Sequence, residues 1–270
     1  MKKIQIWSDK NRVTVFNDGE KEATFLGEFL LDNPQEANGT ILVLPGGGYS
    51  HFGMHEGEAV AKKFNSLNFN AYVLYYRHYP ELYPAPVEDA LRSVRIIRHN
   101  AAIYGYDPNK IAVLGFSAGG HLANCCAFNV ENIEGFNGDE IDKVSAEVNA
   151  LILCYAVVNI CDAVNSHVGS GNNLFGTEEI TDQRKRFNFE NVALDEKTPP
   201  VFFWHTATDR GVPIKYAMEM ANHLWRNNKV AEFHAFSHCD HGIGLAEGHE
   251  DIRIWPELAA NFLKYVFNNK

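Results

Sequence analysis

The feature that most constrains the fold of this chain is the alternation, from about residue 40 onward, of short apolar runs with amphipathic segments. Near-continuous apolar runs of about four to eight residues are typical of strands buried on both faces of a parallel sheet. Segments whose apolar residues recur every three or four positions predict helices that cover those faces. The expected strands are Thr40–Leu44, Ala71–Tyr76, Ile111–Leu114, Ala150–Tyr155, Val201–His205 and Ala231–Ser237, and the expected helices are Glu56–Asn68, Val87–Tyr104, Ser117–Asn129, Ile214–Asn228 and Ile254–Asn268.

The first 35 residues instead contain short runs of alternating polarity, at Lys3–Trp7, Val13–Phe16 and Ala23–Leu31. Such runs predict an antiparallel opening to the sheet. The fold class is therefore α/β, with a mostly parallel central sheet of about eight strands and helices on both faces. Because 270 residues with 46% hydrophobic content can build one large core, we expect residues 1–270 to form a single domain.

One stretch, from Val157 to Thr198, is polar and irregular. It contains the glycine- and asparagine-rich run Gly169–Asn173 and the charged cluster Asp182–Arg186. The stretch is longer than a simple connection between two sheet strands needs. We expect residues 157–198 to form a small cap or lid over the carboxyl ends of the strands, where it would shape a pocket. A partly disordered loop with no role in binding is the alternative.

Charge and cysteine usage exclude several classes of partner. The formal net charge of −10 argues against nucleic acid and anionic membrane surfaces as partners. The two N-terminal lysines are not followed by the apolar stretch of a signal peptide, and no run approaches the roughly 20 apolar residues of a membrane span. We therefore expect a cytoplasmic location, where the five cysteines, including the adjacent pair Cys125 and Cys126, stay reduced.

The most specific motif is Gly115–Gly120, with the sequence GFSAGG, which follows the apolar run Ile111–Leu114 and opens a helix-like segment. A G-x-S-x-G between a strand and a helix is the nucleophile elbow of serine hydrolases. The tight turn strains the backbone of Ser117 and exposes its hydroxyl above the sheet. Gly115 and Gly119 are required because a Cβ at either position would collide with the neighbouring strand or helix. We therefore predict Ser117 as a nucleophile.

A serine hydroxyl needs a base and an orienting acid to act near neutral pH. In the elbow arrangement the acid follows the next-to-last sheet strand. Val201–His205 is that strand, and Asp209 lies just past it in a turn rich in small residues. We choose Asp209 as the acid over Asp195 and Asp162, because neither of these follows a strand as clear. Capping of a helix is the structural alternative for Asp209.

The base is expected in the loop after the last strand. We choose His241 because Gly242 and Gly244 allow that loop to bring the imidazole toward Ser117, and His238 is the runner-up. The segment His238–His241 offers nitrogen, sulfur and oxygen ligands close together. No second cluster completes a four-coordinate set, so we expect no metal site.

Amide donors for an oxyanion are expected from a second loop, Leu44–Tyr49, with the sequence LPGGGY. Pro45 holds the preceding residue extended, and the glycines expose backbone N–H groups. We assign Gly47 and Gly48 as donors together with Ala118, the residue after the nucleophile.

The glycine-rich loop is not followed by Lys-Ser or Lys-Thr, and no acidic residue lies at dinucleotide spacing, so we expect no nucleotide and no other cofactor. Tyr49, Phe52 and Phe175 are aromatic residues that would line an acyl or sugar pocket, with ordinary packing as the alternative.

With these residues placed, the chain resembles the α/β-hydrolase superfamily, and within it the bacterial acetyl-xylan and feruloyl esterases. The resemblance runs from about Thr40 to the C-terminus, and it is carried by Leu44–Tyr49, Val73–Arg77, Ala85–Ala90, Tyr106–Pro108, Gly115–His121, His205–Pro213 and His241–Gly242. It implies an α/β-hydrolase fold and the same roles for Ser117, Asp209, His241 and the three amides. Related lipase-type esterases have His before the glycines where this chain has Pro45, which favours the xylan-esterase-like branch.

The function expected is that of a serine carboxylesterase for small acyl esters. Acetyl esters of sugars or xylo-oligosaccharides are the substrates that the resemblance implies. An amidase, peptidase or lactonase with the same triad is the alternative within enzymes, and a non-catalytic binding protein with this fold is the alternative outside them. The expected partner is a small-molecule ester, and the sequence is compatible with a homo-oligomer.

Overall fold

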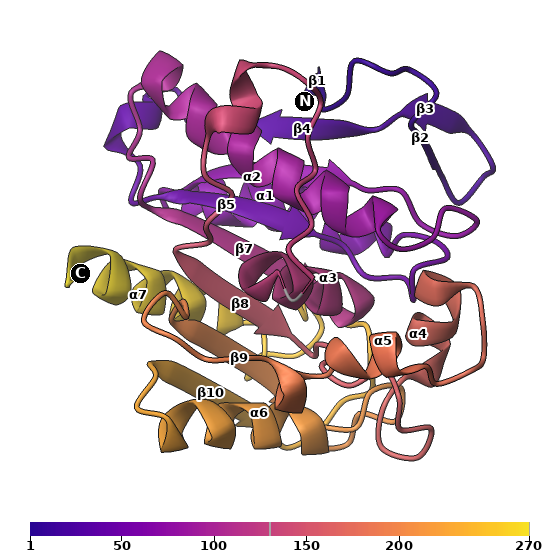
Figure 1. Cartoon of the computed structure of the whole chain (residues 1–270). Helices are drawn as coiled ribbons and strands as arrows, with labels where there is room; N and C mark the ends of the chain where they lie inside the picture. Colours follow the sequence, from indigo (N-terminus) through magenta and orange to yellow (C-terminus); the bar gives the residue numbers. More distant parts are fainter. Residues whose placement is uncertain (130, 270) are drawn as a thin grey trace.

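The structure, a computed structural model, describes residues 1–129 and 131–269 (Figure 1). Its centre is an eight-stranded sheet in the order β1-β4-β6-β5-β7-β8-β9-β10. The strands are β1 (Lys2–Gln5), β4 (Phe25–Phe29), β5 (Thr40–Leu44), β6 (Asn70–Tyr75), β7 (Ile111–Phe116), β8 (Ala150–Cys154), β9 (Val201–Thr206) and β10 (Ala231–Phe236). All strands from β6 to β10 run parallel, whereas β4 is antiparallel to both β1 and β6. The expected mostly parallel sheet with an antiparallel opening is confirmed.

The N-terminal segment differs from the expectation in one respect. β2 (Val13–Val15) and β3 (Lys21–Ala23) form a separate two-stranded hairpin and do not join the main sheet. The run expected as one strand from Ala23 to Leu31 is therefore divided between β3 and β4. Thr24 marks the division, because its amide donates to the Arg12 carbonyl on the hairpin side while its own carbonyl accepts from the Ile6 amide.

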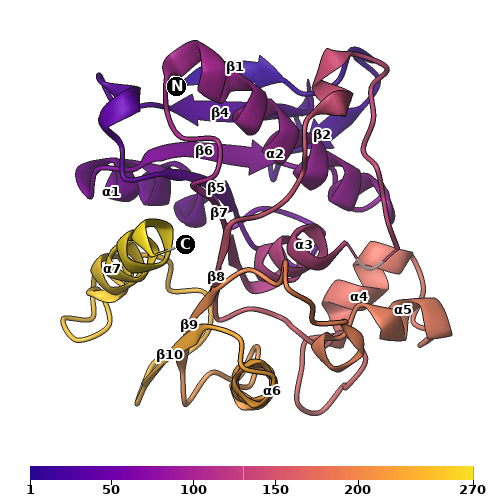
Figure 2. The same ribbon diagram turned by 60° about the vertical axis from the view of Figure 1, so that its left-hand side comes forward.

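Helices cover both faces of the sheet, as the periodicity predicts (Figure 2). α1 (Glu58–Ser66) and α7 (Trp255–Asn268) pack on one face, and α2 (Ala85–Tyr104), α3 (Ser117–Phe128) and α6 (Lys215–Arg226) lie on the other. The first helix begins later than the predicted Glu56, because Gly57 has φ −98° and ψ −102° and separates it from a short 3-10 turn, Met54–Glu56.

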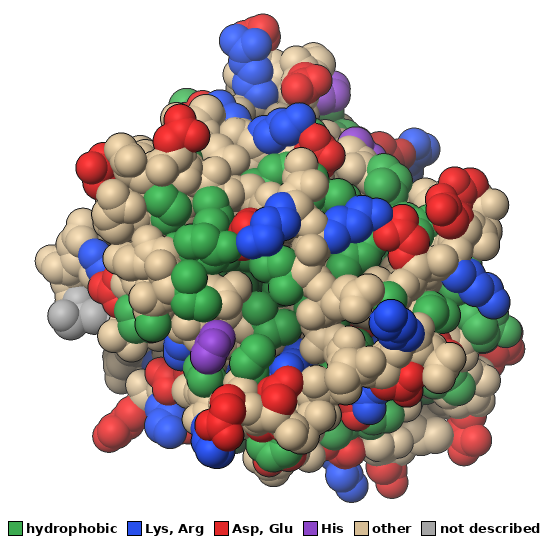
Figure 3. Space-filling view, turned by 90° about the horizontal axis from the view of Figure 1, so that it is seen from above, with side chains coloured by type: hydrophobic (Ala, Val, Ile, Leu, Met, Phe, Trp, Pro, Cys, Tyr) green, Lys and Arg blue, Asp and Glu red, His purple; other side chains and the backbone are tan. Residues whose placement is uncertain are grey.

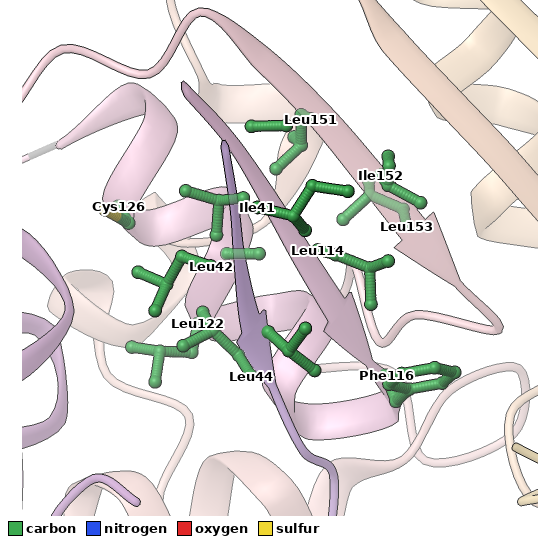
Figure 4. Close-up of a cluster of buried hydrophobic side chains, with 14 of the residues drawn as sticks. Ile41, Leu42, Leu44, Leu114, Phe116, Leu122, Cys126, Leu151, Ile152 and Leu153 are labelled. Carbon is green, nitrogen blue, oxygen red and sulfur yellow. The ribbon is translucent and has the colours of Figure 1, made fainter. Parts of the chain in front are cut away.

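The core lies between the central strands and these helices. Figure 4 shows leucine and isoleucine side chains of β5, β7 and β8 packed together with Leu122 and Cys126 of α3. Ile41, Leu114 and Ile152 on these strands are fully shielded from solvent. All five cysteines are free thiols, and Cys125 and Cys126 are buried as expected. Because the strands are buried on both faces, their carboxyl ends are held rigidly in one row.

The polar segment at 157–198 contains two helices, α4 (Val168–Phe175) and α5 (Asp182–Arg186), and the 3-10 turn Phe189–Asn191. Both helices lie on the side toward which the parallel strands point, at the right in Figure 1. One arginine of the charged cluster, Arg184, is buried. It donates hydrogen bonds to the carbonyl oxygen of Ile160 and, at 2.8 Å, to that of Val168. One guanidinium thus holds the start of the segment at Ile160 against α4 at Val168.

On the face of the molecule shown in Figure 3, acidic and basic side chains are interspersed with hydrophobic ones and do not gather by sign. Within the described residues, no helix has both the length and the apolar character that a membrane crossing requires.

Candidate active site

The nucleophile elbow forms where β7 ends and α3 begins. Ser117 is the first residue of α3 and has a φ of +50°, in the left-handed region that costs free energy for a residue with a side chain. A Cβ on Gly115 would lie 2.2 Å from the carbonyl oxygen of Gly119, and one on Gly119 would lie 2.2 Å from that of Leu44. The two glycines therefore allow strand, turn and helix to approach closely enough to hold the strained serine.

Three side chains from separate loops meet at this turn. His241 Nε2 lies 2.8 Å from Ser117 Oγ, and His241 Nδ1 lies 2.7 Å from Asp209 Oδ2. A carboxylate only accepts hydrogen bonds, so the proton of the neutral imidazole belongs on Nδ1, and Nε2 accepts from the serine hydroxyl. A hydroxyl, an imidazole and a carboxylate thus lie in line, in the order that the sequence predicted for a nucleophile, a base and an acid.

Asp209 is held as an anion by its surroundings. Burial acts to raise the pKa of Asp209, but hydrogen bonds from His205 and His241 and from backbone amides outweigh it and hold the pKa well below its usual range. The amides of Gly211 and Val212 donate to Asp209 Oδ1 at 2.9 and 2.8 Å, which leaves Oδ2 for the two histidines. The carboxylate is therefore fixed in orientation as well as in charge.

The glycine loop after β5 lies beside the serine. Gly47 and Gly48 have φ values of +126° and +63°, and a Cβ on Gly47 would lie 2.0 Å from the His51 carbonyl oxygen. Within residues 1–129 and 131–269, no group accepts a hydrogen bond from the amides of Gly47, Gly48 or Ala118. Gly47 and Gly48 also line the hollow described below, whereas Ala118 is fully shielded from solvent next to Ser117.

A buried carboxyl connects this loop to the loop that carries His241. Glu56 Oε2 accepts from the Gly46 amide at 2.7 Å, and Glu56 Oε1 accepts from the Tyr155 hydroxyl at 2.5 Å. The same hydroxyl accepts from the Gly244 amide at 2.9 Å, and the Tyr155 ring packs edge-on against the His241 imidazole. Burial raises the pKa of Glu56, and the hydrogen bonds from Tyr155 and Gly46 oppose that rise.

A second buried pair fixes the far end of the glycine loop. The Tyr49 hydroxyl lies 2.9 Å from His121 Nδ1 in the first turns of α3. Burial lowers the pKa of His121 to about 4, so the imidazole is neutral and Nδ1 accepts from the phenol. The loop is therefore attached at Gly46 through Glu56 and at Tyr49 through His121.

A hollow of about 410 Å³ opens above Ser117. Its walls include the glycine loop, His51 and His55 from the segment after it, and His167 and Asn173 from the expected cap. No residue among the described ones that line it carries an aliphatic or phenyl side chain. Asn173 Nδ2 donates to the Gly48 carbonyl at 2.8 Å, so α4 is attached to the glycine loop itself.

With this geometry established, the family assignment follows from comparison with known proteins. The family model BD-FAE matches residues 29–224. The chain belongs to the BD-FAE family. The match spans most of the chain and includes Ser117 and Asp209, and His241 lies beyond its C-terminal end.

Relatives of this BD-FAE chain include esterases and a xylanase. It is 34% identical over 221 residues to endo-1,4-beta-xylanase B of Butyrivibrio fibrisolvens. The aligned residues make up 80% of this chain and 34% of the xylanase. It is 30% identical over 225 residues to an acetylxylan esterase of Xylanibacter ruminicola, 80% of this chain and 43% of that protein. The chain thus spans less than half the length of either relative.

A solved structure matches over nearly its full length. The acetyl ester-xyloside bifunctional hydrolase from Caldicellulosiruptor lactoaceticus superposes with a TM-score of 0.87 at 34% identity, covering 98% of this chain and 96% of that one. The fold of the BD-FAE chain is that of the α/β hydrolases, as the sequence resemblance implied.

The structure brings six of the nine predicted site residues to one place: Ser117, Asp209, His241, Gly47, Gly48 and Ala118. The three aromatic residues that were predicted to line the pocket do not line this hollow. Tyr49 is buried beneath the loop, Phe52 packs among Tyr75, Tyr76 and His78, and Phe175 stacks on Tyr83.

The acidic residues and the histidine that the sequence analysis ranked lower make other contacts. Asp162 accepts a hydrogen bond from the Tyr216 hydroxyl at 2.6 Å, Asp195 closes a turn through the Lys197 amide, and His238 pairs with Asp251. Sequence reasoning missed Glu56, Tyr155 and His167. The sequence contained one indication for Glu56. It is an acidic residue at the start of an expected helix, shortly after the glycine loop.

Proposed function

We propose that this chain is a serine carboxylesterase that hydrolyses small acyl esters, with acetyl esters of sugars or short xylo-oligosaccharides as its substrate class. The single observation that carries the proposal is the line of hydrogen bonds from Ser117 Oγ through His241 to Asp209, at 2.8 and 2.7 Å. The names of the relatives, an acetylxylan esterase and an acetyl ester-xyloside hydrolase, support the choice of substrate class.

The proposed reaction proceeds through an acyl-enzyme. The Ser117 hydroxyl attacks the ester carbonyl carbon while His241 Nε2 takes its proton, and Asp209 stabilises the imidazolium that forms. The negative charge moves to the carbonyl oxygen, where the amides of Gly47, Gly48 and Ala118 donate hydrogen bonds to it. His241 then returns the proton to the alcohol as the C–O bond breaks. A water molecule, deprotonated by His241, releases the acid in the second half of the cycle.

The lining of the hollow supports a polar alcohol as one part of the ester. Histidine and asparagine side chains make hydrogen bonds to hydroxyl groups, so His167 and Asn173 suit the hydroxyl-rich alcohol of a sugar ester. The His167 imidazole contributes here, since burial and the neighbouring His241 charge lower its pKa and favour the neutral form. Its Nδ1 accepts from the Ser170 amide at 3.2 Å, so the proton lies on Nε2, which has no acceptor among residues 1–129 and 131–269.

Labelling with a fluorophosphonate probe tests the assignment directly. The wild-type chain is expected to form a covalent adduct on Ser117, and Ser117→Ala is expected to form none while keeping its circular dichroism spectrum. An unlabelled wild type would favour the non-catalytic binding protein. p-Nitrophenyl esters of increasing chain length should show the highest kcat/KM for acetate, and faster turnover of amides or peptides than of acetyl esters would favour the amidase alternative.

A further inference from the structure

The loop after β10 sends its polar side chains to different partners. His241 joins Ser117 and Asp209, and Asp240 pairs with Arg210, whose Nε lies 2.9 Å from Asp240 Oδ2. His238 and Cys239 take no part in either contact. The sequence led us to expect no metal site here, because His238–His241 has no second cluster of ligands nearby in the chain.

The structure supplies the missing residue. His249 lies on the next turn, and its Nδ1 is 3.1 Å from Cys239 Sγ. One ligand atom from each of His238, Cys239 and His249 lies within 4.8 Å of the other two. Two imidazoles and a thiol, drawn from both ends of one loop, thus converge on a common centre.

The backbone of the central ligand is held in place before any ion binds. Cys239 has a φ of +94°, which is strained for a residue with a side chain and persists only where its surroundings hold it. Its carbonyl oxygen accepts hydrogen bonds from the hydroxyls of Thr206 and Thr208 at 2.9 and 2.8 Å. Thr206 ends β9 and Thr208 follows it, so the end of this strand holds the backbone that carries the thiol.

We propose that His238, Cys239 and His249 bind a Zn²⁺ ion. Thiolate and imidazole are the ligands that Zn²⁺ takes in proteins, at about 2.3 and 2.1 Å, which places sulfur and nitrogen about 3.6 Å apart around a tetrahedral ion. The 3.1 Å between Cys239 Sγ and His249 Nδ1 is about 0.5 Å shorter than this value, and the other pairs of ligand atoms lie within 4.8 Å of each other. Asp251, 3.6 Å from His238 Nε2, adds negative charge beside the site, and a water molecule or this carboxylate completes the coordination.

The ion would close the loop from 238 to 249, and that loop carries His241. Binding to the folded state alone stabilises a protein in proportion to the logarithm of the free metal concentration over Kd. The consequence is that Zn²⁺ would raise the thermal midpoint of the chain and restrain the segment next to His241.

The test uses the full chain, stripped with chelator and titrated with Zn²⁺ against a chromophoric competitor. We expect one equivalent to bind with a Kd that rises at least tenfold in Cys239→Ser and in His249→Ala. Titration with Co²⁺ should produce a thiolate-to-metal charge-transfer band that Cys239→Ser abolishes. The matched control, Cys161→Ser with His99→Ala, removes one thiol and one imidazole elsewhere and should leave the Kd and the band unchanged.

Binding of less than one equivalent, or a Kd and a cobalt band that Cys239→Ser leaves intact, would overturn the proposal. If Cys239→Ser does not fold, His249→Gln carries the same test, since it removes an imidazole from the other end of the loop. The readouts are metal affinity and absorbance, so their outcome is independent of whether the chain is an esterase.

Discussion

The hydroxyl of Tyr155 donates a 2.5 Å hydrogen bond to the buried carboxyl of Glu56. Through this bond the glycine loop, held by Glu56 at Gly46, is joined to the histidine loop, held by Tyr155 at Gly244. The two loops carry the proposed oxyanion donors and the proposed base. The Glu56 carboxyl, which also borders the hollow, therefore sets the spacing of these two loops.

Replacing Glu56 with Gln tests this link. A glutamine has one acceptor oxygen for the two donors, so one of the bonds to Gly46 or Tyr155 is lost. Hydrogen bonds to charged groups contribute about 1.5–3 kcal/mol, which corresponds to about 10- to 100-fold in kcat if the loops separate in the transition state. We expect that fall in kcat on p-nitrophenyl acetate with KM changed by no more than about threefold.

Glu58→Gln is the matched control, because Glu58 is an exposed carboxylate on α1 that pairs with Lys62. It should leave kcat unchanged. A Glu56→Gln variant that loses stability but keeps its kcat would show that the carboxyl has a structural role alone.

Asp209→Asn should lower kcat about 10⁴-fold, because an amide favours the wrong tautomer of His241 and does not stabilise the imidazolium. The fold should persist, since the Gly211 and Val212 amides keep an acceptor oxygen. Steady-state kinetics with p-nitrophenyl acetate checks the loss. Asp195→Asn, at the competing carboxylate, should retain wild-type turnover, and a comparable loss there would contradict the assignment of the acid.

Gly47→Ala should lower kcat about 10²- to 10³-fold, the usual effect of losing an oxyanion donor. A methyl group at this position would lie 2.0 Å from the His51 carbonyl oxygen, so the loop must shift and displace the Gly47 amide. Gly248→Ala is the control, since a Cβ there meets no atom within 4 Å. Equal kcat values for the two variants would exclude the glycine loop as a source of donors.

Stability should fall as the pH is lowered from about 6.5 to about 4, with His121 as one cause. The folded-state pKa of His121 is lowered to about 4 by burial, whereas a histidine in the unfolded chain titrates near 6.5. The unfolded state therefore binds the extra proton in this window, and the free energy of unfolding rises with pH. The difference of pKa corresponds to about 3 kcal/mol across the window.

Urea unfolding at several pH values checks this dependence. His121→Asn keeps an acceptor for the Tyr49 hydroxyl and removes the titrating group, so the slope between pH 4 and 6.5 should become shallower. Burial lowers the pKa of His78 and His167 as well, so some slope should remain. An unchanged slope would mean that His121 already carries a proton in the folded state.

The positions of the main elements could be predicted because their signals are local. The apolar runs of β5 to β9 and the turn at Ser117 depend on residues that adjoin in the chain, and they lie where the pattern placed them. The meeting of the three site loops could also be predicted, since each follows a parallel strand and parallel strands end at the same edge of the sheet.

Other features depend on partners that the sequence does not place together. α4 contains glycine, serine and asparagine, which have low helix propensity. The helix forms nevertheless beside Arg184, which donates hydrogen bonds to the Val168 carbonyl and the Asn172 side chain. Glu56 and Tyr155 are 99 positions apart. The aromatic residues predicted to line the pocket pack in the interior instead, because a ring buries more apolar surface there than in an open hollow.

The hydrogen bond from Asn173 to the Gly48 carbonyl has an evolutionary consequence. The segment that varies most easily among related folds, an insertion between two strands, is fastened here to the loop proposed to stabilise the oxyanion. Exchange of this insertion between relatives would alter turnover together with selectivity, so new substrate ranges should arise only through paired changes in α4 and the glycine loop.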